Sequence, residues 1–213
     1  MSEPLYEASN RRLTTDCSNE LIRQTLNVDY TGLPYATPEA RRYLIEMIDS
    51  AKSKGLAVAF IDADLNELKP INDELGHQKG NEAITAWANQ VRERIMGLSV
   101  ADVFFYRPQA GGDELKVLLI LNTKEKDKIA KALLLVQQTL AQTTNFEGRE
   151  LTASYGIESN DFENNVDPAK TLQDLESKAE DGKDNMKLGR IIKKIDNTIA
   201  SGRKLQLTEY KQN

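Results

Sequence analysis

The chain has 213 residues and a formal net charge of −5, which suits one domain with extensions and argues against a general nucleic-acid binder, because such binders present a basic face. Its only cysteine, Cys17, excludes an internal disulfide and a cysteine-built zinc site. No apolar run approaches the ~18 residues of a membrane span and the N-terminus has no signal-peptide core, so we expect a soluble, cytoplasmic protein with no membrane and no nucleic-acid partner.

The first element is an N-terminal extension, residues 1–28, which is polar and shows a weak helical pattern in its second half. Its role stays open between a linker and a dimerisation segment. A turn-rich stretch, Asp29 to Pro34, follows it. Thr37 then predicts a helix N-cap with Pro38 at the first helical position, and Lys54-Gly55 predicts the end of that helix.

A continuous apolar run over Leu56 to Ile61 predicts a buried central strand. Asp62 and Asp64 follow at period two, so we expect their side chains to point the same way. These acids also resemble the start of an EF-hand calcium loop. That interpretation is rejected, because Glu67 stands where such a loop needs glycine and Asp73 replaces its bidentate glutamate.

The segment from Asn66 to Asp73 should open a helix, whose free backbone N–H groups and dipole attract phosphate. A second, amphipathic helix is predicted over Glu82–Met96, with Trp87 in the core rather than as a base-stacking platform. Asn81 is a candidate N-cap for that helix. His77 is interpreted as a structural turn residue rather than a general base.

A hairpin is predicted from two strands, Val103–Arg107 and Leu115–Leu121. Gly111 and Gly112 lie in the loop between them and would allow positive φ and close approach of a ligand. The loop is long, because Pro108 to Ala110 separate the arginine from the glycines.

The acids of this hairpin point to a metal site. If the two apolar runs are neighbouring strands, Asp64 comes close to Asp113 and Glu114, since opposed residues have Cα atoms roughly 4.5–5.5 Å apart. Carboxylates that close repel each other unless a cation sits between them, and Mg²⁺ takes one or two carboxylates plus substrate phosphates. A solvated turn is the alternative interpretation of these acids.

The rest of the chain predicts three further elements. They are a helix over Lys124–Gln142, a strand over Leu151–Ile157, and a helix from Asp167 or Pro168 that continues over Ile191–Ala200 before a polar tail, 201–213. The element order predicts an α+β fold with helices packed on a largely antiparallel central sheet. We assign 29–190 to the folded domain and 191–213 to a C-terminal helix and tail.

Two stretches carry a family resemblance. Asp64 to Asp73, DLNELKPIND, followed by Gly76-His77, resembles the DxDxFKxIND…GH signature of GGDEF domains, the diguanylate cyclases. Gly111 to Leu115 resembles the GGDEF signature itself, with leucine for phenylalanine. The opening motif DxLTGL, the strand TxSxGI and, loosely, the ending ADxAMYxAKxxGR also have counterparts at 29–34, 151–157 and 179–190. The resemblance implies a palm-type nucleotide cyclase fold over roughly 29–190.

The resemblance also implies a catalytic site. Asp64, the carbonyl of Leu65, Asp113 and Glu114 would hold Mg²⁺ or Mn²⁺, with Asp113 and Glu114 as catalytic residues. Asp113 would help to deprotonate the attacking hydroxyl. Asn66 stands where a second aspartate is usual in the family.

The nucleotide contacts follow from the same register. The triphosphate would lie on the turn at Leu68 and Lys69, near Gly111 and Gly112. Lys187 and Arg190, in the C-terminal motif, are further candidate phosphate contacts. Lys187 sits one residue closer to the arginine than the lysine of the family motif.

Guanine recognition would fall to Asn72 and Asn81, and Asn81 departs from the family, which has aspartate there. A carboxylate accepts both guanine donors, whereas the amide NH₂ of asparagine faces a donor. Purine selectivity is therefore open.

The implied reaction condenses two GTP into cyclic di-GMP and two pyrophosphates, by attack of a 3′-hydroxyl on an α-phosphate in an at least transient homodimer. Two alternatives remain: a degenerate nucleotide-binding signalling module without turnover, and a palm cyclase with altered purine preference. Ser99 to Asp102 lacks the arginine of the family's inhibitory product site, so product feedback there is not expected.

Overall fold

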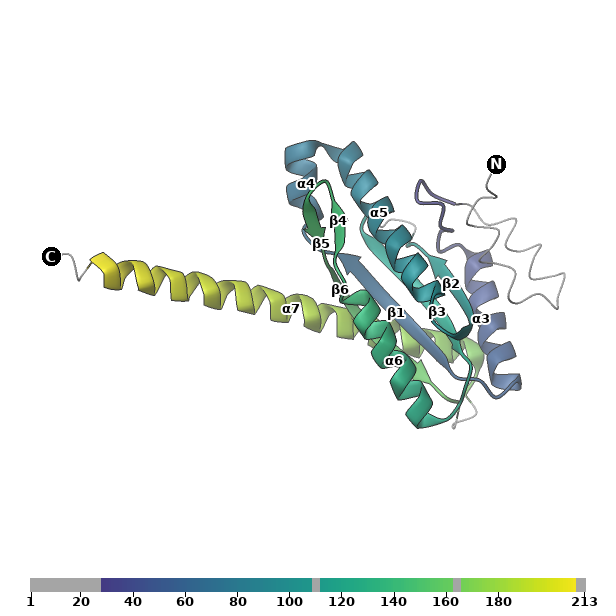
Figure 1. The fold of residues 1–213 in the computed structure, drawn as a ribbon. Coiled ribbons are helices and arrows are strands. Elements are labelled where there is room, and N and C mark those ends of the chain that lie inside the picture. The colour runs from purple at the N-terminus through teal and green to yellow at the C-terminus, as the bar shows by residue number, and fades with distance from the viewer. Residues whose placement is uncertain (1–27, 109–111, 163–165, 210–213) are drawn as a thin grey trace.

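The computed structural model describes residues 28–108, 112–162 and 166–209, with side chains in the last helix described up to residue 195. The helix expected within the N-terminal extension therefore lies outside the described residues. Figure 1 shows the arrangement of the elements. In chain order these are α3 (Pro38–Ser53), β1 (Val58–Leu65), α4 (Leu68–Leu75), α5 (His77–Met96), β2 (Val100–Tyr106), β3 (Glu114–Leu121), α6 (Lys126–Leu140), β4 (Thr144–Phe146), β5 (Arg149–Leu151), β6 (Ala153–Asn160) and α7 (Pro168–Glu209).

The centre of the fold is a four-stranded sheet in the order β2-β3-β1-β6, with every neighbouring pair antiparallel. Helices α5 and α6 pack on one face and α3 and α7 on the other, so the sheet forms the middle layer (Figure 1). This confirms the predicted α+β fold with an antiparallel sheet flanked by helices.

Strand β1 shows how the two layers arise from alternation along one strand. Ala59 and Ile61 join the core beneath α5 and α6, whereas Val58 and Phe60 join the core beneath α3 and α7. Asp62 continues the face of Phe60, so a carboxylate lies among buried residues. The predicted strand ended before the acids; that boundary is wrong, because Asp62 and Asp64 both pair with β3 and β6.

Helix α3 begins and ends where the sequence predicts. The side chain of Thr37 accepts a hydrogen bond from the backbone N–H of Ala40 at 3.2 Å, and Pro38 opens the helix. Lys54 is the C-cap, and Gly55 follows with a φ of +65°. That left-handed backbone is one that glycine adopts without strain.

Helix α5 begins earlier than predicted, at His77 instead of Glu82. Asn81 is therefore a helix residue and not the N-cap, and that prediction is wrong. The break lies at Gly76, whose φ of +87° separates α4 from α5. Trp87 is 3% exposed, which confirms its place in the core, while His77 lies exposed at the helix start.

Two features of the second half were not predicted. A two-stranded sheet, β4 with β5, uses part of the expected strand, which is interrupted at Thr152. Helix α7 is one 42-residue helix: its continuation over 191–200 was predicted, and its extension beyond residue 200 was not. Residues 201–209, expected as a tail, are helical, and Figure 1 shows this end projecting away from the sheet.

Apolar side chains lie exposed on the projecting part of α7. Leu188, Ile191, Ile192 and Ile195 are each 50–55% exposed. Even so, none of the described helices combines the length and the apolar character needed to cross a bilayer.

Arg107 joins the first described segment to the hairpin. Its guanidinium pairs with Asp29 at 3.0 Å, and both side chains are at most 2% exposed. The same side chain donates to the carbonyl of Gly112 at 2.5 Å and lies 5.2 Å from the ring centre of Tyr30. A buried charged group therefore fixes the turn-rich segment beside the loop that carries the acids.

Candidate functional site

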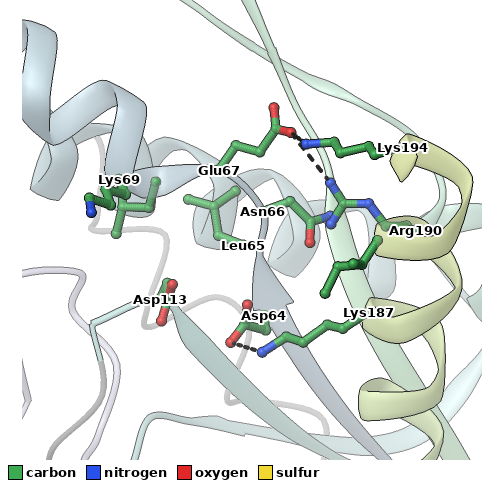
Figure 2. A pocket seen from close by; sticks show the side chains of 11 residues that line it. Asp64, Leu65, Asn66, Glu67, Lys69, Asp113, Lys187, Arg190 and Lys194 are labelled. Atoms are coloured by element: carbon green, nitrogen blue, oxygen red, sulfur yellow. Dashed lines mark hydrogen bonds and ion pairs between the residues drawn. The ribbon is translucent and has the colours of Figure 1, made fainter. Parts of the chain in front are cut away.

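A pocket lies where β1 ends, between the start of α4 and the middle of α7. Figure 2 shows the side chains around it. Its lining comprises Asp64, Leu65, Asn66, Glu67, Leu68, Lys69, Asp113, Lys187, Arg190, Ile191 and Lys194. The pocket thus gathers seven charged groups from four parts of the chain: the end of β1, the start of α4, the turn before β3, and α7.

The strand register brings the predicted acids together. Asp64 lies directly opposite Glu114 on neighbouring strands, and the N–H of Leu65 donates to the carbonyl of Asp113 at 3.0 Å. The prediction that the two apolar runs are adjacent strands is confirmed. Asp64 and Asp113 both line the pocket, whereas the side chain of Glu114 is not part of the lining.

The pKa of Asp64 reflects its burial and the carboxylate beside it. Burial raises the pKa of Asp64, and repulsion from Asp113 raises it further, although the ammonium of Lys187, 2.8 Å away, acts in the opposite sense. Figure 2 shows Lys187 reaching Asp64 from α7. A carboxylate whose pKa is raised by burial and by a second nearby carboxylate is one beside which an added cation would be stabilised.

Glu114 has a different neighbour. Its carboxylate accepts a hydrogen bond from Lys183 at 2.8 Å, and Lys183 also donates to Asp62 at 2.9 Å. Partial burial alone would raise the pKa of Glu114, but the ammonium of Lys183 outweighs this and lowers the pKa. The remaining oxygen of Asp62 pairs with Lys116 at 2.6 Å.

Lys183 was not predicted as a site residue, although two signals in the sequence point to it. Asp62 follows the buried face of its strand at period two, and a buried carboxylate requires a partner. Lys183 falls four residues after Ala179, on the face of α7 that is buried against the sheet. A basic residue continuing a buried helical face is the natural partner for a buried strand acid.

Glu67 closes the pocket between α4 and α7. It precedes α4 with a φ of +61°, and its carboxylate pairs with Lys194 and, at 3.9 Å, with Arg190. These contacts appear as dashed lines in Figure 2. Arg190 also donates to Ser154 at 3.3 Å, so its guanidinium lies between α7, β6 and the start of α4.

The predicted phosphate contacts fall into two groups. Leu68, Lys69, Lys187 and Arg190 all line the pocket. Gly111 lies outside the described residues. Gly112 is exposed, an added Cβ there would meet no atom within 4 Å, and its φ is not positive, although glycine would allow that conformation. The phosphate-binding candidates therefore lie on the helices α4 and α7 that flank the pocket.

The two predicted base-reading residues lie outside this lining, at the junction of α4 and α5. The side chain of Asn72 packs so closely on Gly80 that a Cβ there would lie 1.9 Å from its Oδ1. Asn81 is the next residue along α5 and is exposed. Their shared location makes this junction a candidate subsite separate from the charged pocket.

The donor set fits a hard divalent cation in part. Asp64, Asp113 and the backbone at Leu65 offer the oxygen ligands that Mg²⁺ prefers, with room in its coordination for substrate phosphate. Among the described residues, however, no three acidic, histidine or cysteine side chains converge on one point. The expected third carboxylate, Glu114, instead contacts Lys183.

Comparison with known proteins identifies the family. The family model described as "Diguanylate cyclase, GGDEF domain" matches residues 38–188. The probable diguanylate cyclase DgcJ of Escherichia coli is 34% identical over 106 residues, which make up 48% of this chain and 19% of that protein. The cyclic di-GMP phosphodiesterase NbdA of Pseudomonas aeruginosa is 32% identical over 145 residues, 67% of this chain and 17% of that protein. The chain thus spans less than a fifth of these curated relatives.

Solved structures share the fold. A sensory box/GGDEF family protein from Caulobacter crescentus matches with a TM-score of 0.55 at 25% identity, covering 76% of this chain and 98% of that chain. The coiled coil and GGDEF domain of DgcB from Caulobacter crescentus, solved in complex with c-di-GMP, matches with a TM-score of 0.58 at 16% identity, covering 81% and 85%. At that identity the second match supports the fold alone.

Proposed function

The chain belongs to the GGDEF family, and from this premise we propose that it is a diguanylate cyclase, which condenses two GTP molecules into cyclic di-GMP and releases two pyrophosphates. The observation that carries the proposal is the pocket in which Asp64 and Asp113 lie beside the start of α4 and the basic face of α7. Carboxylates for a metal and cations for a triphosphate are the two requirements of metal-assisted nucleotidyl transfer.

Phosphate binding is assigned to the helices. The N-terminal turn of α4, at Leu68 and Lys69, presents backbone N–H groups and a favourable dipole to an anion. Lys187 and Arg190 approach from α7. Lys187 now neutralises Asp64, and in the substrate complex it would turn to the phosphates, because a metal ion at Asp64 takes over that neutralisation.

Metal binding is assigned to Asp64 and Asp113, with the carbonyl of Leu65. A bound Mg²⁺ or Mn²⁺ would stabilise the negative charge that develops on the reacting phosphate. Asp113, at the edge of the pocket, is the candidate that accepts the proton of the attacking 3′-hydroxyl. Each subunit would hold one GTP, so the reaction requires two copies of the chain to face each other at least transiently.

Two observations favour alternative functions. Asn81 stands at the junction subsite, which favours a cyclase with altered purine preference, because an amide cannot accept from both guanine donors. Lysines contact both Asp64 and Glu114, which favours a nucleotide-binding module without turnover. In that module the two ammonium groups would stand permanently where the reaction requires metal.

One experiment separates the three functions. The protein is incubated with each ribonucleoside triphosphate and Mg²⁺ or Mn²⁺, and the products are separated by chromatography. Cyclic di-GMP from GTP, abolished by Asp113→Asn, is the expected result. A cyclic dinucleotide from another purine supports the altered cyclase. Nucleotide binding without any product contradicts the cyclase proposal and supports the binding module.

A further inference from the structure

Two acids oppose each other at the end of the central strands. Asp64 on β1 and Glu114 on β3 are direct partners in the register, and like charges in that position destabilise a sheet. Helix α7 supplies a cation to each. Lys187 contacts Asp64 and Lys183 contacts Glu114, both at 2.8 Å. The two lysines are one helical turn apart, so one helix face neutralises both acids without a metal ion.

The two lysines differ in exposure, and therefore in how readily each could move away from its carboxylate. The side chain of Lys187 is 36% exposed at the pocket, whereas that of Lys183 is 3% exposed. Lys183 also donates to Asp62, which is fully buried. If Glu114 turned to a metal ion, the ammonium of Lys183 would lose one of its two carboxylates, which is costly for a charged group on a side chain that is only 3% exposed.

The backbone fixes Lys183 as well. At Gly156 the strand β6 lies so close to α7 that an added Cβ would be 1.8 Å from the carbonyl oxygen of Ala179 and 2.7 Å from the backbone nitrogen of Lys183. Gly182 makes the reciprocal approach to Gly156. This close backbone packing of α7 on β6 holds residue 183 next to the sheet, where its ammonium contacts Asp62 and Glu114.

We propose that Lys183 is the permanent counter-cation of Glu114 and a positioning residue that holds this carboxylate away from the metal, so that the site binds one divalent ion through Asp64 and Asp113. This assignment rests on the proposed function, because it concerns the same site. It departs from the metal ligands that the sequence motif implies, since Glu114 is removed from them. Lys116, at 2.6 Å from Asp62, completes a chain of four alternating charges that needs no external cation.

The test is direct Mn²⁺ binding to the full chain, measured by electron paramagnetic resonance with and without α,β-methylene GTP. We expect one Mn²⁺ per chain. Glu114→Gln should change the dissociation constant by less than about twofold, while Asp64→Asn should weaken binding roughly tenfold or more, as for loss of a charged ligand. Weakening by Glu114→Gln comparable to that by Asp64→Asn, or two Mn²⁺ per chain, overturns the proposal.

A second variant tests Lys183 itself. Lys183→Met leaves Glu114 without its cation, so Mn²⁺ binding should tighten roughly tenfold or gain a second ion, because the metal no longer competes with a charge-assisted hydrogen bond. Adding Glu114→Gln should cancel that gain, and Lys183→Arg should not show it. A merely structural role would produce neither the gain nor its cancellation, and that result contradicts the proposal.

The outcomes also separate this proposal from the proposed function. Cyclic di-GMP production together with Glu114-dependent Mn²⁺ binding overturns the role of Lys183 and leaves the cyclase intact. Absence of both Mn²⁺ binding and product overturns the two together. Should Lys183→Met fail to fold, as judged by circular dichroism, Glu114→Gln in the otherwise unchanged chain still decides the question.

Discussion

Asn81 is the residue at which the chemistry of the site departs most clearly from the family motif. It is exposed on α5, next to the glycine on which Asn72 packs. Asn81→Asp should raise the ratio of kcat/KM for GTP over that for ATP by roughly tenfold or more, because a carboxylate accepts from both N1–H and the 2-amino group of guanine. Competition between GTP and ATP in one reaction measures this ratio.

ITP is the control for that comparison, because its base keeps N1–H and lacks the 2-amino group. The gain for ITP should be smaller than the gain for GTP. An unchanged ratio for all three nucleotides would remove Asn81 from the base subsite.

Gly156 is a second residue at which a substitution has a specific expected effect, because its backbone packs directly against α7. A Cβ there would overlap the backbone of α7, at 1.8 Å from the carbonyl oxygen of Ala179. Gly156→Ala should lower the free energy of unfolding by about 3 kcal/mol, since backbone must move apart rather than a flexible side chain. Chemical denaturation measures the loss.

Gly189→Ala is the matched control in the same helix, because no atom lies within 4 Å of its added Cβ. It should stabilise the chain by about 0.5–1 kcal/mol through helix propensity. Equal effects of the two substitutions would contradict the close packing of α7 on β6.

Individual residues also show how far the sequence alone could lead. The positions of Asp64 and Asp113 follow from two apolar runs that end in acids, because strand pairing converts that pattern into proximity. Lys183 continues the buried face of α7 that includes Ala179, but it was missed because the apolar pattern of that face does not include a charged residue. The role of Glu114 as a metal ligand stays a prediction, because spacing gives the position of a carboxylate but not its partner, which in the structure is Lys183.

At the scale of elements, the ion pair of Asp29 with Arg107 fixes the first described segment to the end of β2. Both groups are buried, so Arg107→Met should lower the free energy of unfolding by about 3–5 kcal/mol, because it leaves the Asp29 charge without its cation. Arg41→Met is the control: its pair with Glu176 has the same 3.0 Å separation but is half exposed, and its loss should cost less than about 1 kcal/mol. Urea denaturation measures the free energy of unfolding of both variants. Similar losses in the two would contradict the importance of burial.

The contact of α7 with β3 predicts a dependence on pH. The ammonium of Lys183 holds the pKa of Glu114 below its ordinary value of 4.5, so the stabilisation is complete above that value and is lost as the pH falls through the lowered pKa. Lys183→Met should therefore destabilise the chain by about 2 kcal/mol or more at pH 7, and the difference from the wild type should shrink below about pH 4.5. Urea midpoints at several pH values measure this difference; a gap that stays constant down to pH 3 would contradict it.

Element boundaries show which signals were local. Thr37-Pro38 marked the start of α3, because a cap and a proline act through adjacent backbone groups. The start of α5 was placed too late because Asn81 resembles an N-cap, whereas Gly80 before it already lies within the helix as the close contact for Asn72. The β4–β5 ribbon and the last part of α7 had no comparable local signal. The ribbon depends on pairing between two short segments, and the last part of α7 projects away from the sheet.

At the scale of the whole molecule, the projecting half of α7 separates the site from the far end of the chain (Figure 1). Its inner face contributes Lys187 and Arg190 to the pocket, while Leu188 and Ile192 are exposed. The same helix thus lines the site with one face and exposes apolar side chains on another.

The proposed reaction joins two substrates held by two copies of the chain, and this gives a prediction about concentration. In the proposed reaction each pocket would hold one nucleotide, so a lone chain would bind GTP without closing the cyclic product. Below the dissociation constant of the dimer, the fraction of paired chains falls in proportion to total concentration. The rate of pyrophosphate release per chain should therefore fall roughly tenfold for each tenfold dilution in that range.

Two copies joined by a flexible linker should keep their rate on dilution, because the linker sets the effective concentration. A rate per chain that stays flat for the unlinked protein down to nanomolar concentration would mean that one chain suffices, and the two-subunit reaction would have to be abandoned.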